Sequence, residues 1–578
     1  MGKDFALERA ENNDATGQYA SLQDPIEAMR TLINKQEMQA IVDFIHKKNF
    51  ADDAESGAPQ GELSRRAESV HQLAVVNTEN VLSRQANDGY GGTLSIDARG
   101  NKAIIYKDGA RRVENTDGTG YTLTPNSDGS FAQHNWYPAP EHFWHVDRNK
   151  HPDRRLSAEQ VLAMDNANLL SDAQHYIKDP EELKTFQDNM QVLEARSARD
   201  GISAGQMALT YAHIDTLLRA RGDIGTNDFG RVVLAEQVMA LAADPLKNSR
   251  QGGYNTCGAA DIEFAMYTRH PEAAAPVVAD VALSGKYVAR DGTTVAIDMT
   301  PQGESAVDRD ADYTMAKRGV DRNERSYASQ LFQVATLNVA LTKFAPSLNV
   351  TEAKYYQDAQ GEGVDYTQNG VKMHEDSFGM SQAMMTTTYE AMSGGDKLTV
   401  IRQSSSENTV LVGAAPVVKS EAQFNEILKQ AKTPVMVFVN ADNEPFEQPV
   451  RDKNGHYWDR DESGHSIVIT AVDFQSPQKA KQLQVYNTQG QDIVFGKGGQ
   501  ISAHDLYLST LTRKDEIAAL RQDLRNERKS GHVETWKELT LVRLEIEEKR
   551  ISRAEAQRRL NEIIAHLPSG QRLALGVR

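Results

Sequence analysis

The stretch RQGGYNTCGAADIEFAMYTRHP, from Arg250 to Pro271, contains the only cysteine of the 578-residue chain. Asn255 and Thr256 are residue types that cap helices, and the run that begins at Cys257 is compatible with a helix as far as Pro271. We therefore expect Cys257 in the first turn of a helix, where unpaired backbone amides and the helix dipole lower the pKa of a thiol. Gly258 is expected to leave open space for a substrate. A buried structural cysteine is the alternative, and it is more common for this residue type.

A nucleophilic thiol needs a base, and one of the 15 histidines has a distinctive setting. His465 follows Gly464 and leads into SIVITAV, a run typical of a strand. The next predicted strand, LQVYN, ends at Asn487, whose side-chain amide can accept a hydrogen bond from the imidazole and orient it. Asp473, at the end of the His465 strand, is the competing orienting acid. A partly buried strand histidine and a turn asparagine are the structural alternatives.

The fourth candidate is Gln251, which lies six residues before Cys257. Its amide could donate to the oxyanion of a tetrahedral intermediate, and a surface loop glutamine is the alternative. The motifs occur in a fixed order: a Gln, a Cys-Gly at a helix start, a Gly-His that opens a strand and an Asn-x-x-Gly that closes the next strand. This order resembles that of the papain-like cysteine peptidases. It is also similar to the bacterial peptidases that remove bacteriocin leader sequences.

This resemblance, which covers residues 245–510, implies an α+β fold in which the helix bearing the cysteine packs on an antiparallel sheet bearing the histidine and the asparagine. It also implies the roles: Cys257 attacks, His465 is the base, Asn487 orients the imidazole and Gln251 completes the oxyanion hole. Gln489 stands where the family has a tryptophan that shelters the His–Asn pair, which predicts a weaker hydrogen bond between them.

Three functions are compatible with these residues. The first is a cysteine peptidase or related thiol hydrolase that acts on a protein or peptide substrate. The second is an acyltransferase or transglutaminase-like enzyme, which would use the same residues and pass the acyl group to an amine instead of water. The third is a non-catalytic interaction protein built on a degenerate papain-like scaffold.

Four further regions surround the papain-like region, 248–510. Residues 1–85 are polar, with one predicted helical segment. Residues 86–150 carry Asp-Gly pairs between short alternating runs, which predict a small antiparallel β-sheet. Residues 151–247 are predicted to be helical, and residues 511–578 to form a charged helical hairpin that packs on the body or on a protein partner. The Asp-Gly pairs begin at Asp88, Asp108, Asp117 and Asp128. The helix signals are the capping-box pairs Ser157–Gln160 and Ser203–Gln206, Asp179 before Pro180, and the apolar stripe Leu560, Ile563, Ile564 and Leu567.

Composition excludes several classes of function. A net charge of −17 argues against a nucleic-acid or anionic-membrane partner. The absence of a signal-peptide pattern and of a long apolar run predicts a protein that is cytoplasmic or exported without a classical signal, with no transmembrane segment. No P-loop and no His-Glu-x-x-His motif is present, so neither a cofactor nor a metal is expected. One alternative metal site consists of His134, His142, His145 and His151, for which an aromatic-rich packing loop is the favoured interpretation. A calcium site among the Asp-Gly pairs is disfavoured, because the acidic spacing does not fit an EF-hand loop.

Overall fold

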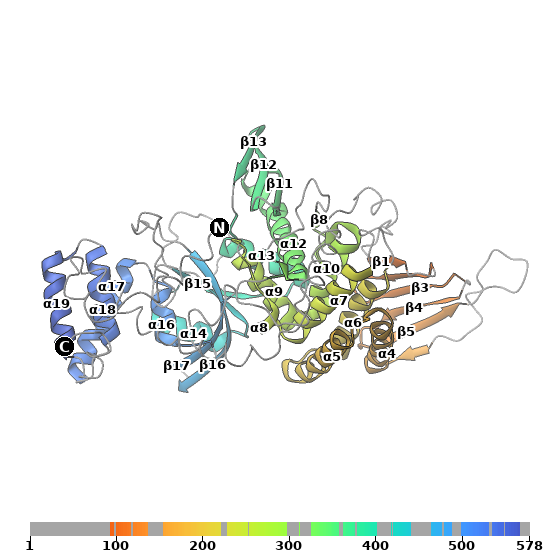
Figure 1. Ribbon diagram of the computed structural model, residues 1–578, viewed down its shortest axis with the longest axis horizontal. Coiled ribbons are helices and arrows are strands. Elements are labelled where there is room, and N and C mark those ends of the chain that lie inside the picture. The colour runs from red at the N-terminus through yellow and green to blue at the C-terminus, as the bar shows by residue number, and fades with distance from the viewer. Residues whose placement is uncertain are drawn as a thin grey trace, which may run out of the picture.

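The computed structural model describes residues 93–566 with gaps, the longest of which are 137–153, 402–417 and 441–463. The helical segment predicted within residues 1–85 lies outside the described residues. The chain is a mixed α+β protein in which a six-stranded sheet, a helical body, a five-stranded sheet and a group of C-terminal helices follow one another along the long axis (Figure 1). No helix in the described ranges has both the length and the apolar character needed to cross a membrane.

The six-stranded sheet is an antiparallel meander in which each strand pairs with the next one along the chain. Gly109 and Gly129 have φ values of 85° and 79°, which confirms the turns predicted at Asp108 and Asp128. Asp88 and Asp117 lie outside the described residues. The last strand extends the sheet beyond residue 150, where its end was expected. The strands are β1 (Thr93–Ile96), β2 (Lys102–Ile105), β3 (Arg111–Glu114), β4 (Gly120–Pro125), β5 (Phe131–Trp136) and β6 (Arg154–Leu156).

A block of helices follows, and its start signals are those expected from the sequence. Ser157 and Ser203 each form a complete capping box with the glutamine three residues on, and the Asp179 carboxylate accepts from two backbone amides of the helix that begins at Pro180. The helices are α4 (Ala158–Tyr176), α5 (Pro180–Asp200), α6 (Ala204–Arg219), α7 (Asp228–Ala243) and the short α8 (Pro245–Asn248).

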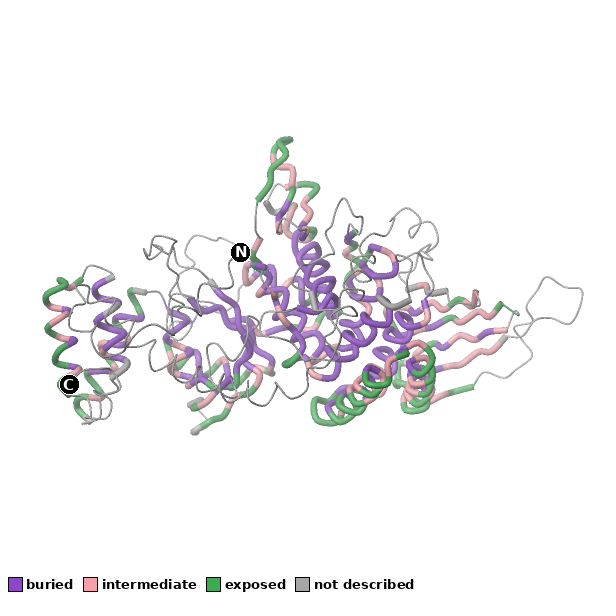
Figure 2. Tube along the Cα trace, in the orientation of Figure 1, coloured by how far each residue is buried: buried purple, intermediate pink, exposed green. Residues whose placement is uncertain are grey.

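The centre of the molecule is one apolar core that runs from Leu169 in α4 to Tyr486. Its central helices are α9 (Cys257–Arg269), α10 (Pro271–Ser284), α12 (Tyr327–Phe344) and α13 (Gln382–Ser393), and Figure 2 shows α9 and α12 buried along most of their length. Small elements complete this part: β7 (Lys286–Val288), β8 (Thr294–Ala296), β9 (Ala311–Asp312), β10 (Arg325–Ser326) and the 3₁₀ turn Ala345–Leu348. Because α6 and α7 pack on α10 and α9, this core crosses position 247, where a boundary was expected.

The five-stranded sheet packs on this core through one face. It has the order β14-β15-β16-β17-β18, and its last four strands are antiparallel as expected. The first strand is parallel to its neighbour, so the sheet is mixed; helix α14 lies between the two strands in sequence and supplies the crossover that parallel pairing requires. The strands are β14 (Thr399–Ile401), β15 (Val435–Asn440), β16 (Gly464–Ser476), β17 (Lys479–Tyr486) and β18 (Gln500–Ser502), and the helix is α14 (Glu421–Gln430).

Side chains alternate between the two faces of this sheet. Met436, Phe438, Val468 and Tyr486 join the central core, whereas Val437 and Ile467 belong to a second core with Phe424 of α14. The sheet is therefore buried on both faces, and its α9-facing side fixes the relation between the helix that carries the cysteine and the strand that carries the histidine.

Two parts project from this body. A three-stranded antiparallel sheet, which we call the β-arm, stands out beside α12 and consists of β11 (Val350–Gln357), β12 (Glu362–Gln368) and β13 (Val371–Glu375). At the C-terminal end, α16 (Ala503–Ser509) leads into three helices, α17 (Arg513–Ser530), α18 (Thr535–Glu547) and α19 (Arg553–His566). The expected helical hairpin thus has a third helix. Leu560 and Ile563 of the predicted stripe are buried against α18, and Leu567 lies outside the described residues.

Candidate active site

Cys257 is the first residue of α9, as the sequence predicted. The preceding Thr256 occupies the cap position, but its side chain does not cap the helix. Its hydroxyl instead lies 3.1 Å from the Gln251 carbonyl oxygen and 2.8 Å from Oε1 of Gln333. This arrangement leaves the first backbone amides of α9 without a side-chain cap, so they remain directed at the thiol.

The surroundings of the Cys257 thiol shift its pKa in opposite directions. Burial raises the pKa of Cys257 to about 11, the Asp261 carboxylate adds to this effect, and backbone N–H groups of Ser466, Gly258 and Cys257 itself oppose it. The helix start does favour the thiolate, as expected, but burial outweighs it. A thiol with this pKa carries its proton at neutral pH, so its chemistry depends on a base.

Gly258 does not provide space for a substrate. A Cβ atom at this position would lie 3.1 Å from Cβ of Met380 and 3.1 Å from Sδ of Met385. Gly258 is buried in the contact between α9 and α13, and the expectation of an open cavity beside the thiol was wrong at this residue. The glycine is needed because the two helices approach too closely for a side chain.

The structure brings His465 and Asn487 together. Nε2 of His465 lies 2.9 Å from Oδ1 of Asn487, and the two side chains are only 7% and 1% exposed. Burial lowers the pKa of His465, while the hydrogen bond to Asn487 opposes the shift, so the imidazole is neutral near pH 7. With its proton on Nε2, the ring offers Nδ1 as the proton acceptor. The two side chains of the pair are thus sheltered from solvent.

Asp473 is excluded as the group that orients His465. It does not end the strand, because β16 continues to Ser476. Asp473 is exposed and lies eight residues along an extended strand from His465, which corresponds to roughly 26 Å. Asn487, directly after β17, holds the position opposite the histidine.

Ser466 connects the two halves of the site. It follows His465 in β16, and its backbone N–H is directed at the Cys257 thiol. Its hydroxyl donates to the carboxylate of Asp261, one turn along α9 from the cysteine. The start of α9 and the start of β16 therefore meet at this serine.

Gln251, the fourth predicted residue, is buried in the loop before α9, where its Nε2 donates to the Tyr254 carbonyl at 3.1 Å.

A buried polar network that was not predicted from the sequence supports the loop before Cys257. Gln333 of α12 donates to the Arg250 carbonyl at 2.6 Å and to Glu263 at 2.8 Å, and it accepts from Arg325 at 2.9 Å. Burial is the main reason that the pKa of Glu263 rises to about 7. The polar residues Ser329, Gln330 and Gln333 in an otherwise apolar helix were the available signal for such a network.

The network reaches the β-arm. Arg325 donates to Gln357 at 2.6 Å, and Gln357 donates to the hydroxyl of Tyr355 at 2.7 Å. That hydroxyl donates to Glu362 at 2.6 Å, and the other carboxylate oxygen of Glu362 accepts from the backbone N–H of Asn255 at 2.8 Å. The base of the β-arm is thus hydrogen-bonded to the backbone two residues before the candidate nucleophile.

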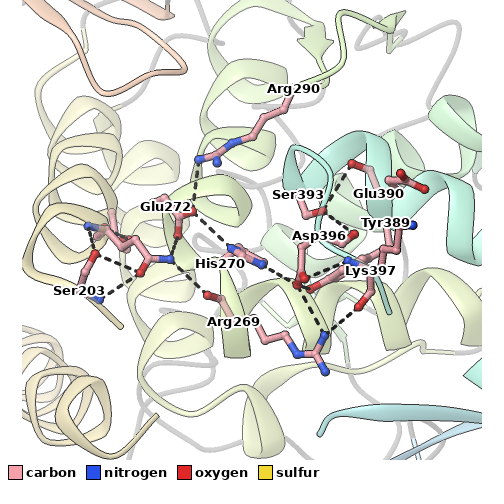
Figure 3. A network of polar contacts seen from close by, with 12 residues as sticks. Ser203, Arg269, His270, Glu272, Arg290, Tyr389, Glu390, Ser393, Asp396 and Lys397 are labelled. Atoms are coloured by element: carbon pink, nitrogen blue, oxygen red, sulfur yellow. Dashed lines mark hydrogen bonds and ion pairs between the residues drawn. The ribbon is translucent and has the colours of Figure 1, made fainter. Parts of the chain in front are cut away.

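The other end of α9 is fixed by a second set of charges (Figure 3). Arg269 donates to the Pro434 carbonyl at 3.0 Å, and His270 contacts Asp396 at 2.8 Å. Glu272 pairs with Arg290 at 3.3 Å. A cleft of about 1030 Å³ opens beside this network, lined among others by Arg196, Arg269 and His270, so this cleft lies at the opposite end of the helix from the cysteine. We assign the network a structural role in holding α9.

Within the described ranges no group of three or more His, Cys, Asp or Glu side chains could hold a metal ion. Of the four histidines considered as alternative ligands, His134 lies in β5 and the other three fall outside the described residues.

Comparison with known proteins gave no match: neither a family model, nor a curated protein, nor a solved structure matches this chain.

Proposed function

We propose that the protein is a thiol hydrolase, most simply a papain-like cysteine peptidase, that cleaves a peptide or amide bond. Cys257 is the nucleophile, His465 the general base and Asn487 the residue that orients the imidazole. The observation that carries the proposal is the buried hydrogen bond between His465 and Asn487. His465 lies at the start of β16, and the next residue, Ser466, directs its backbone amide at the Cys257 thiol.

The chemistry follows from the protonation states. His465 takes the proton of Sγ on its Nδ1, and Sγ forms a bond to the carbonyl carbon of the substrate. The tetrahedral intermediate collapses as the carbon–nitrogen bond breaks, and the imidazolium gives its proton to the departing amine. Water then attacks the thioester with His465 again as base, which releases the acid and restores the thiol.

The developing oxyanion needs donors. The backbone N–H of Cys257 is one of the uncapped amides at the start of α9, and Gln251 supplies a side-chain amide from the same loop. That amide donates to the Tyr254 carbonyl, which fixes the direction of the group that we assign to the oxyanion. A protein or peptide is the substrate class that fits this chemistry, and nucleic acid has no part in it.

A peptide-cleavage assay tests the proposal. The full-length protein is incubated with a mixed peptide library, and products are identified by mass spectrometry, with Cys257→Ala as the control. We expect new peptide termini with the wild type and none with the variant. If the products appear as amides when a primary amine is added, the enzyme is an acyltransferase. Absence of any product, together with an unreactive thiol, would favour the interaction-protein alternative.

A further inference from the structure

Asp261 is a carboxyl group buried one turn below the candidate nucleophile. It is 0% exposed, and residues four apart on a helix lie on the same face, so Asp261 is directly beneath Cys257. Its Oδ2 accepts from the Ser466 hydroxyl, and its Oδ1 has no hydrogen-bond partner among the described residues. The described part of the chain also places no Lys, Arg or His in an ion pair with it.

The surroundings of Asp261 disfavour a negative charge. The groups that face it are the Cys257 thiol on its own helix, Ser466 on β16, the Met385 thioether near Ser466 on α13, and the Tyr486 phenol on β17. None of these groups is a cation at neutral pH. A carboxylate without a countercharge is costly to bury, so burial raises the pKa of Asp261 well above its usual value.

The hydrogen bond between Ser466 and Asp261 also connects two elements of the candidate site. It joins the helix that carries the cysteine to the strand that carries the histidine, at the residue directly after His465. Loss of this hydrogen bond therefore alters the position of the thiol relative to the imidazole, whereas a substitution that keeps an acceptor oxygen at residue 261 preserves it.

We propose that Asp261 is a positioning residue which, in its neutral form, holds Cys257 and His465 in register through Ser466, and which reduces the reactivity of the thiol when it ionises. This inference rests on the proposed thiol chemistry. The second half follows from charge: an ionised carboxylate one turn below the sulfur disfavours the thiolate, whereas the neutral acid does not.

The test is the rate of Cys257 alkylation by iodoacetamide as a function of pH, measured on the full chain. The lone cysteine makes the signal unambiguous. For Asp261→Asn, a neutral isostere, we expect an unchanged rate near pH 7 and a faster rate than the wild type at alkaline pH, where Asp261 ionises. If Asp261 were already charged at neutral pH, the same variant would react about tenfold faster or more there, and the proposal would be overturned.

The positioning role is tested with Ser466→Ala, which removes the bridge. Misplaced reacting groups lose rate steeply, so we expect alkylation near pH 7 to slow by about tenfold or more. Ser329→Ala is the matched control, because Ser329 donates at 2.6 Å to Glu263, another buried carboxyl of α9, but Ser329 belongs to α12 and not to the histidine strand. Equal rates in the two serine variants would refute the positioning role.

An independent readout concerns stability. Because the pKa of Asp261 is raised in the folded state, the wild type loses stability as pH rises from about 4 toward that pKa, and Asp261→Asn does not. In urea unfolding, the stability of Asp261→Asn minus that of the wild type should be larger near pH 8 than near pH 5.

His465→Ala serves as the reference for the proposed thiol chemistry. If it leaves alkylation unchanged, the proposed function fails. If it slows alkylation while Ser466→Ala does not, and Asp261→Asn shows no faster rate at alkaline pH, only the present inference fails.

Discussion

At the residue scale, Cys257 is held by forces that oppose one another. Helix-start amides favour its thiolate, while burial and Asp261 favour the thiol, and together these raise its pKa to about 11. At neutral pH the thiol therefore carries its proton, and in the proposed function its reactivity depends on His465 as the base. The position of Cys257 at a helix start could be predicted from sequence, because capping residues and a following helical run are local signals. Its pKa could not, since it depends on residues of β16 and α13 that are distant in sequence.

Gly258 offers a stability prediction. Gly258→Ala should destabilise the protein by about 1–3 kcal/mol, because the added methyl group meets Met380 and Met385 in a packed core. The matched control is Gly205→Ala in α6, where a Cβ has nothing within 4 Å and the substitution should be neutral or stabilising through helix propensity. Urea unfolding of both variants measures the difference. A Gly258→Ala variant as stable as the Gly205→Ala variant would contradict the packing described.

At the element scale, α9 is held at both ends, and the β-arm is connected to its start. The Glu362 carboxylate at the base of β12 accepts from the Asn255 amide, two residues before Cys257. In the same three-stranded sheet, β12 is the central strand, and the neighbouring edge strand β13 is exposed along its length. The connection implies that the arm sets the conformation of the loop that precedes the candidate nucleophile.

This connection can be tested by substitution. Glu362→Ala should slow thiol alkylation or peptide cleavage by about tenfold, because the loop loses its anchor, while Glu362→Gln keeps an acceptor oxygen and should retain most of the rate. Glu375→Ala is the control, since Glu375 accepts from Tyr366 within the arm and is exposed. The outcome that opposes this view is an equal, small effect of all three substitutions.

Elements were more predictable than their pairing. The hairpin turns at Asp108 and Asp128 and the capped helices α4, α5 and α6 follow from local chemistry. So do the strand that carries His465 and the strand that ends just before Asn487. The parallel pairing of β14, the β-arm and the third C-terminal helix were not foreseen, because non-local contacts decide them. Asp473 was a candidate only because the length of β16 was underestimated; that strand is extended by pairing with β17.

At the scale of the whole molecule, one core joins the helical block to the candidate catalytic region, and the C-terminal helices are attached through a charged contact. His504 of α16 lies between Glu421 of α14, at 3.1 Å, and Asp523 of α17, at 2.6 Å. Burial alone would lower the pKa of His504, but the hydrogen bonds to these two carboxylates raise it to about 10.

The sign of the pH effect follows from this shift. The raised pKa means that the stabilisation by His504 is fully present below its unfolded pKa of about 6.5 and is lost as pH rises through about 10. His504→Gln should therefore cost about 1.5–3 kcal/mol near neutral pH and progressively less in alkali. Urea unfolding at several pH values checks this, with the exposed His175 replaced by Gln as control. A cost that does not change with pH would contradict the ion-pair account.

The central claim is that His465 activates Cys257, and the pH dependence of thiolate formation tests it most directly. Ultraviolet absorbance of the thiolate reports on Cys257 alone, because the chain has one cysteine. The wild type should show an apparent thiol pKa below about 11, the value that burial and Asp261 set, because transfer of the proton to the imidazole favours the thiolate. In His465→Ala the apparent pKa should be higher than in the wild type, because the variant has no imidazole at this position to accept the thiol proton. The same pKa in both proteins would contradict the account.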